Sequence, residues 1–323
     1  MNHQSSMTKN TKLAFVFPGQ GSQSAGMLSD LVKNFSIAGQ TFAEASDVLG
    51  YDLWSLIENG PVQDLNRTEI TQPAMLTAGV ATWRVWQEKN GAKAAFLAGH
   101  SLGEYTALVC TGSIEFPAAV AVVADRGKIM QEAVPDGIGA MAAILGLEDM
   151  DVIRLCETAA GTEIVSAANF NSPGQVVIAG HHEAVGRVVI SAKEAGAKRS
   201  VILPVSVPSH CALMTEAAQR FSARLLSISV ADANIPVIQN VDASPHTASK
   251  DILPILLAQL YKPVRWTDTI HTMIKLGVGS IIECGPGRVL CGLNKRIDPG
   301  LQCMPVFDTT SLHKALGYFE EKV

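Results

Sequence analysis

The sequence lacks features that membrane and nucleic-acid-binding proteins carry. No stretch approaches the roughly 20 apolar residues that a membrane-spanning helix needs, and the segment from Met1 to Thr11 has no apolar centre of the kind found in signal peptides. Lysine and arginine form no runs, and the formal net charge is -5, so nothing offers a positive field to a phosphate backbone. We therefore expect a cytoplasmic protein with a flexible tail over residues 1–10, and neither a membrane nor a nucleic acid as partner.

Closely spaced cysteine pairs are absent too. The chain has six cysteines and no C-x-x-C motif, which disfavours both a disulfide framework and a zinc site. These cysteines are Cys110, Cys156, Cys211, Cys284, Cys291 and Cys303. We expect reduced thiols and no bound metal.

What the chain does have is apolar patterning that alternates in period. With 323 residues, 47% of them hydrophobic, it can bury one large or two medium cores. Short apolar runs predict buried strands at 13–17 and 94–98, and apolar spacings of three and four predict helices at 43–58 and 72–89. Strands that alternate with helices indicate an α/β fold with a parallel sheet covered on both faces.

The middle of the chain changes to a different order. It reads strand, helix, strand, strand, helix, strand, which is typical of a ferredoxin-like unit. The expected elements are 140–145, 148–160, 163–169, 175–179, 182–195 and 199–205. We expect this small domain, residues 134–206, to be inserted into an α/β-hydrolase-like large domain made of 11–133 and 207–310, which includes a strand at 280–283.

The pentapeptide Gly99-His100-Ser101-Leu102-Gly103 fits the pattern G-x-S-x-G, with a predicted strand before it and a helix after it. A sharp turn in that context presents the serine hydroxyl, and the helix start supplies N–H groups for a developing oxyanion, that of Leu102 being the natural candidate. A glycine-bordered turn with an incidental serine is the alternative.

A serine hydroxyl needs a base to become a nucleophile. His210 is the best candidate of eight histidines, because it ends the proline-restricted stretch Val207-Pro208-Ser209-His210, where the chain returns toward the main sheet. No acid completes a triad in the serine, acid, histidine order of elbow hydrolases. A dyad whose ring is oriented by a carbonyl or amide is also compatible with catalysis.

Several further segments occur together, in a fixed order, between about residues 13 and 290. They are Phe17-Pro18-Gly19-Gln20-Gly21-Ser22-Gln23, Gly99-His100-Ser101-Leu102-Gly103-Glu104, Asn169-Phe170-Asn171-Ser172-Pro173-Gly174-Gln175, Val207-Pro208-Ser209-His210, Gln259-Leu260-Tyr261-Lys262-Pro263-Val264-Arg265-Trp266 and Glu283-Cys284-Gly285-Pro286-Gly287. In these segments the chain resembles the malonyl-CoA:acyl carrier protein transacylases of bacterial fatty acid synthesis.

The resemblance implies a role for each matching position. Ser101 would be the nucleophile, His210 its base, and the backbone carbonyl of Gln259 the group that holds the ring. The N–H groups of Gln20 and Leu102 would form the oxyanion hole. Arg126 would bind the malonyl carboxylate, although an ordinary ion pair on a helix is its alternative reading. Asn169 and Gln175 are further candidates for the cleft.

The implied reaction transfers a malonyl group from malonyl-CoA, through an ester on Ser101, to the phosphopantetheine thiol of acyl carrier protein, with no cofactor. Other acyl specificity, a serine thioesterase or esterase, and a non-catalytic subunit that binds carrier protein are the alternatives. Because carrier protein is expected to be acidic, a local basic patch would help docking. Its candidates are Lys193, Lys198 and Arg199.

Overall fold

The computed structural model describes residues 12–135, 137–205 and 207–321, so the expected tail over 1–10 lies outside the described residues. A six-stranded sheet runs through the centre of the molecule, in the order β10-β9-β1-β2-β7-β8. All neighbouring strands are parallel except β7 and β8, which form an antiparallel hairpin. The strands are β1 Lys12–Phe17, β2 Phe96–Gly99, β7 Val237–Ile238, β8 Pro245–His246, β9 Val278–Cys284 and β10 Gln302–Val306.

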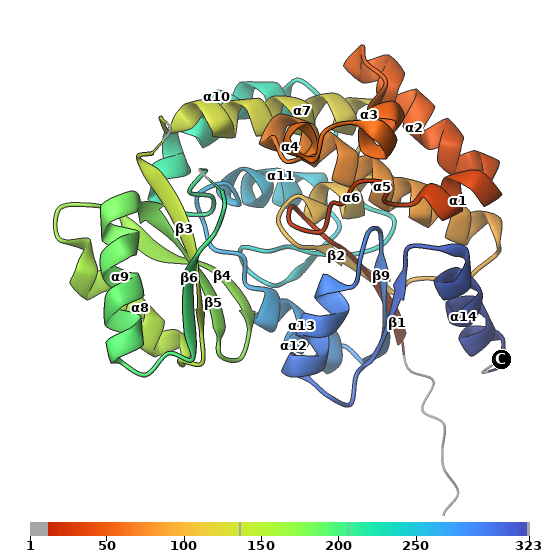
Figure 1. Cartoon of the computed structure of the whole chain (residues 1–323). Coiled ribbons are helices and arrows are strands. Elements are labelled where there is room, and N and C mark those ends of the chain that lie inside the picture. Colours follow the sequence, from red (N-terminus) through yellow and green to blue (C-terminus); the bar gives the residue numbers. More distant parts are fainter. Residues whose placement is uncertain (1–11, 136, 206, 322–323) are drawn as a thin grey trace, which may run out of the picture.

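Helices cover both faces of this sheet (Figure 1). Because side chains alternate along a strand, Phe15 and Phe17 of β1 enter the larger core, whereas Ala14 and Val16 enter a second core on the opposite face. Helices α5 Thr68–Glu88, α6 Gly103–Cys110 and α7 Phe116–Ala133 pack in the larger core, and α12 Trp266–Lys275 and α13 Val289–Ile297 pack in the second. The predicted parallel sheet with two covered faces is confirmed.

Further helices lie mostly over the larger core. They are α1 Ser29–Asn34, α2 Ser36–Leu49, α3 Leu53–Asn59, α4 Val62–Leu65, α10 Thr215–Leu226, α11 Ser249–Ala258 and α14 Thr309–Glu320, with a 3-10 turn η1 at Ala212–Met214.

Two helix predictions need correction. The single helix expected over 43–58 is wrong: α2 ends where Gly50 takes a left-handed φ of 74°, and α3 begins where the Asp52 side chain accepts a hydrogen bond from Ser55 N–H. Helix α5 begins at Thr68, a turn before the expected position, so Pro73 lies inside the helix. Apolar spacing continues across Gly50, so only local backbone geometry separates α2 from α3, whereas the first turn of α5 is mostly polar and extends beyond the apolar pattern.

A second sheet of four antiparallel strands is formed by β3 Gly139–Leu145, β4 Val165–Ser172, β5 Gln175–His181 and β6 Arg199–Ile202, in the order β4-β5-β3-β6. Helices α8 Asp149–Ala160 and α9 His182–Glu194 share a core with it. This is the predicted ferredoxin-like order, although β6 is shorter than expected. Backbone hydrogen bonds between β4 and Val264 join the small sheet to the rest of the molecule, and the exact domain limits stay a prediction.

Candidate active site

The turn that carries Ser101 connects β2 to α6, and its two bordering glycines are required by contact. A Cβ on Gly99 would lie 1.8 Å from the carbonyl carbon of Gly103, and a Cβ on Gly103 would lie 2.0 Å from the carbonyl oxygen of Phe17. Ser101 itself has a left-handed φ of 50°, a conformation that costs a non-glycine residue about 1–2 kcal/mol. Close packing of strand and helix therefore forces the sharp turn that presents the serine.

His210 lies beside this serine. Ser101 Oγ and His210 Nε2 are 2.8 Å apart, and His210 Nδ1 lies 2.7 Å from the carbonyl oxygen of Gln259. Because that carbonyl can only accept, Nδ1 carries the proton and Nε2 is left free to accept the serine proton. His210 also has a left-handed φ, of 63°. Such strain is held by the surrounding structure and is common at functional sites.

The imidazole of His210 is kept neutral. Burial and the positive charge of Arg126 lower its pKa to about 3, although the hydrogen bond to Gln259 acts in the opposite direction. Within the part of the chain that the structure describes, no carboxylate serves as a third member: Asp232 accepts from Ser249 N–H, Asp242 contacts His246, and Asp268 pairs with Arg265. The orienting group is a backbone carbonyl.

Two backbone N–H groups lie near the elbow, the turn Gly99–Gly103 that carries Ser101. They are those of Gln20 and Leu102, and neither has an acceptor among the described residues. The loop after β1 packs directly on the turn, since a Cβ on Gly19 would lie 2.4 Å from His100 O and 3.7 Å from Leu102 N. Backbone N–H donors of this kind near a serine hydroxyl can stabilise an oxyanion.

Arg126 of α7 is a buried cation, 1% exposed. Its Nη1 donates to Gln72 Oε1 at 2.8 Å and its Nη2 to Gln259 Oε1 at 3.0 Å, while its Nε has no partner among the described residues. Gln259 Nε2 in turn donates to Ser101 O at 2.9 Å. One glutamine thus links the arginine, the serine and, through its carbonyl, the histidine. Donors remain free on the guanidinium for a carboxylate.

A cavity of about 330 Å³ opens over the serine. Gln20, Ser101, His210 and Asn169 are among its lining residues, and Arg126 is not. Gln175, the other cleft candidate, is not among these lining residues, and its Oε1 accepts a hydrogen bond from Arg296.

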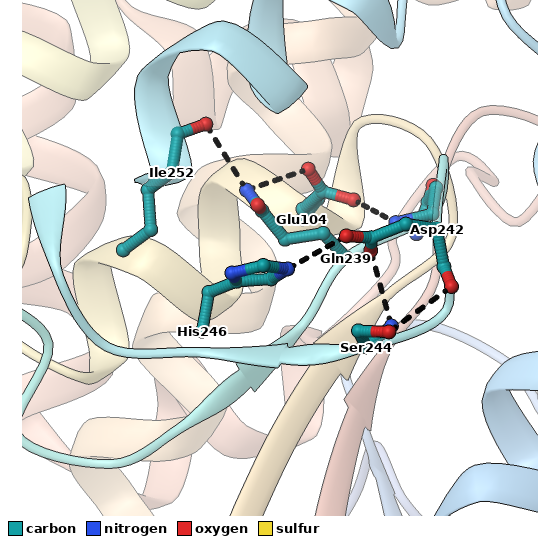
Figure 2. Close-up of polar contacts among 7 residues, drawn as sticks. Glu104, Gln239, Asp242, Ser244, His246 and Ile252 are labelled. Atoms are coloured by element: carbon teal, nitrogen blue, oxygen red, sulfur yellow. Dashed lines mark hydrogen bonds and ion pairs between the residues drawn. The ribbon is translucent and has the colours of Figure 1, made fainter. Parts of the chain in front are cut away.

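Two other histidines near the site are already engaged. His100 lines the cavity, but its Nε2 lies 2.8 Å from Asn171 Oδ1, and burial lowers its pKa. His246 Nε2 lies 2.7 Å from Asp242 Oδ2 on the β7–β8 hairpin (Figure 2). Neither replaces His210 beside Ser101.

Over the described ranges, no group of three or more His, Cys, Asp or Glu side chains is placed to hold a metal ion. In the same part of the chain, no helix combines the length and apolarity needed to cross a bilayer. All six cysteines are unpaired.

Sequence reasoning overlooked three residues that contact the site. Gln72 binds Arg126, Asn240 binds the backbone of the elbow, and Glu104 binds Asn240. Glu104 ends the segment Gly99–Glu104, and its acidic side chain in an apolar helix was an available signal. Asn240 had none, because it lies 139 residues from Ser101 after a strand of only two residues.

Comparison with known proteins identifies a matching family model and similar proteins. Residues 14–296 match the family model described as "Acyl transferase domain". The chain is 53% identical over 306 residues to the malonyl CoA-acyl carrier protein transacylase of Escherichia coli strain K12, covering 95% of this chain and 99% of the relative. It is 42% identical over 314 residues to the protein of the same name from Bacillus subtilis strain 168, covering 97% and 98%.

Solved structures agree with these sequence matches. An acyl carrier protein S-malonyltransferase from Vibrio cholerae superposes with a TM-score of 0.92 at 55% identity, covering 94% of this chain and 99% of the other. A malonyl-transacylase solved in complex with its type II PKS acyl-carrier protein gives a TM-score of 0.94 at 54% identity, covering 95% and 100%.

Proposed function

Because the chain belongs to the malonyl CoA-acyl carrier protein transacylases of the acyl transferase family, we propose that it moves a malonyl group from malonyl-CoA to acyl carrier protein through an ester on Ser101. This transfer supplies malonyl units to fatty acid synthesis. The observation that carries the proposed chemistry is the 2.8 Å contact between Ser101 Oγ and a neutral, carbonyl-oriented His210.

In the first half-reaction, His210 Nε2 accepts the Ser101 proton as Oγ attacks the thioester carbonyl of malonyl-CoA. The N–H groups of Gln20 and Leu102 donate to the oxyanion of the tetrahedral intermediate. The C–S bond then breaks, coenzyme A takes the proton from His210 and leaves as a thiol, and the malonyl group remains on Ser101 as an ester.

In the second half-reaction, the phosphopantetheine thiol of acyl carrier protein gives its proton to His210 and attacks the same ester carbonyl. Collapse of the intermediate returns the proton to Ser101 Oγ and releases malonyl-carrier protein. The two substrates thus use one serine in turn, which is ping-pong chemistry. Coenzyme A enters as part of a substrate, and the proposed steps call for no further cofactor.

Arg126 provides the malonyl preference in this proposal. Its buried guanidinium has two neutral amide partners and an Nε with no partner among the described residues, so it suits a carboxylate better than a methyl group. An acetyl group would leave the buried cation without an anion, which costs about 2–5 kcal/mol and corresponds to about 30-fold to several thousandfold in selectivity.

The residues of the elbow alone would equally serve a thioesterase or an acyltransferase for another acyl group. The buried arginine favours an acyl group that carries a carboxylate, and a hydrolase would gain nothing from it. The cytoplasmic location expected from the sequence stays a prediction, which fractionation of cells producing the tagged protein would test.

The decisive experiment is the intact mass of the protein after brief exposure to malonyl-CoA, with acetyl-CoA and the Ser101→Ala variant in parallel. We expect a malonyl-sized increase in the wild-type protein only, discharged by acyl carrier protein and slowly by water. An adduct that forms equally with acetyl-CoA and is lost at once to water would replace the transferase with a hydrolase.

A further inference from the structure

Glu104 is a fully buried acid that the proposed mechanism does not use. Its Oε2 accepts a hydrogen bond from the backbone N–H of Asn240 at 2.7 Å, and its Oε1 lies 3.4 Å from Gln239 Nε2 (Figure 2). Burial raises its pKa to about 8, against the lowering effect of the Asn240 N–H. Burying a carboxyl group away from water is costly unless hydrogen bonds compensate. The short hydrogen bond from Asn240 N–H therefore helps to stabilise Glu104 in this position.

Asn240, which receives this hydrogen bond through its main chain, uses its side chain on the elbow. Nδ2 donates to Gly99 O at 2.6 Å, and Oδ1 accepts from Ser101 N–H at 2.7 Å. The amide therefore spans His100 and binds the backbone on both sides of it. Asn240 itself is 0% exposed, its hydrogen bond to Gly99 is buried, and its hydrogen bond to Ser101 is partly buried.

Strand pairing brings these groups together. Strands β2 and β7 run parallel with Ala98 opposite Ile238, so the elbow and Asn240 follow their strands at the same edge of the sheet. The turn after β7 is itself braced, because Asp242 Oδ1 accepts from Ser244 N–H at 3.1 Å and Asp242 Oδ2 contacts His246 (Figure 2). Asn240 thus reaches the elbow from a rigid support.

The elbow needs such support for two reasons. Ser101 has a left-handed φ of 50°, and strained residues persist only where their surroundings hold them. The hydrogen bond to Asn240 also occupies Ser101 N–H, which leaves the neighbouring N–H of Leu102 as the elbow donor available to an oxyanion.

We propose that Asn240 is a positioning residue for acyl transfer, whose side chain clamps the strained Ser101 turn from both sides, and that Glu104 positions the clamp by holding the Asn240 backbone. The inference rests on the proposed function, because it concerns the same serine. It differs from that function in assigning the geometry of the nucleophile to residues that touch neither substrate nor His210.

The test compares Asn240→Ala with Thr111→Val at the other end of α6. Thr111 is a matched control, because its buried hydroxyl also binds a backbone C=O and N–H, those of Ile235, at 3.0 and 2.8 Å. We expect both variants to lose thermal stability, but only Asn240→Ala to slow malonyl-ester formation, by about 10- to 100-fold in kcat with KM changed less than about threefold.

The role of Glu104 is tested by removing or keeping its acceptor oxygen. Glu104→Gln keeps an oxygen for the Asn240 N–H and should stay within about threefold of the wild-type rate, whereas Glu104→Ala should approach the loss of Asn240→Ala. Because Glu104 acts through Asn240, the double variant Glu104→Ala/Asn240→Ala should be no slower than Asn240→Ala alone. Losses that multiply would overturn the role given to Glu104.

Labelling of Ser101 by a fluorophosphonate separates this inference from the proposed function, because it reports nucleophile geometry without malonyl-CoA. Asn240→Ala should be labelled about 10-fold or more slowly than Thr111→Val. If the two variants label and acylate equally while wild type forms the malonyl ester, Asn240 is only structural. If wild type labels but never takes a malonyl group, the proposed function fails, and the clamp still stands where Asn240→Ala labels more slowly than Thr111→Val.

Discussion

The six-stranded and the four-stranded sheets contribute to the cavity in different ways. Every group that the proposed reaction uses comes from segments around the parallel sheet, where Ser101 follows β2 and Gln20 follows β1. The small sheet supplies wall residues such as Met141 and Val177, and its polar Asn171 binds His100. Parallel strands end together at one edge, so the large sheet gathers chemical groups while the small sheet shapes the space around them.

The largest difference in acylation rate between variants of the two regions should come from removal of the base, His210, compared with a change in the small-sheet wall. In His210→Ala, the serine loses its proton acceptor, and we expect malonyl-ester formation to slow by about 10⁴-fold or more. Met141→Ala, on the small-sheet wall of the same cavity, should change the rate less than about tenfold. Single-turnover acylation followed by intact mass measures both, and equal losses would break the distinction.

Loss of the buried cation should come next. We expect Arg126→Ala to reduce kcat/KM for malonyl-CoA by about 30-fold to several thousandfold, while the rate with acetyl-CoA stays equal or rises. Arg224→Ala is the control, because it removes a neighbouring arginine whose partner Asp125 lies at the surface of α7. A parallel fall with both thioesters in Arg126→Ala would indicate a structural role instead of carboxylate recognition.

The acid side of the pH profile should show a smaller effect. Since burial and Arg126 lower the pKa of His210 to about 3, the neutral base persists at any pH above that value. We expect malonyl-ester formation to change less than about threefold between pH 7 and 5, whereas a histidine with the ordinary pKa of about 6.5 would lose about 25-fold.

The same shift has a consequence for folding. Because the unfolded chain binds a proton at the ordinary histidine pKa and the folded chain does not, the free energy of unfolding should fall as the pH drops from about 6.5 toward 3. Circular dichroism at each pH shows whether the protein is still folded where the rate is measured. An inflection near pH 6.5 in a fully folded sample would contradict a buried neutral base.

Charge reversal beside the small sheet should also have only a small effect. Lys193, Lys198 and Arg199 are exposed, and Arg199 begins β6, whereas Leu203, just past its other end, lines the cavity. We expect reversal of all three charges to lower the rate with acyl carrier protein about threefold at low salt, and less as salt screens the charges. No change at low salt would remove this patch from docking.

Much of the architecture followed from periodicity. The strands around residues 13–17, 94–98 and 280–283 and the order of the small sheet were predicted and are present. The break at Gly50 was missed because apolar spacing continues across it, and β7 was missed because two residues carry no period.

For the site, the sequence by itself determined which residue types were available. These are a serine between two glycines, a histidine shortly after a proline, and motifs in the order typical of a family. The contact between the Gln259 carbonyl and His210 was implied by the family resemblance, but tertiary structure alone decided that the Gln259 side chain joins Arg126 and Ser101. It also decided that Asn240 holds the elbow and that Gln175 lies elsewhere. Local spacing encodes turns and helices, but contacts between distant segments arise only when strands pair and bring their ends to one edge.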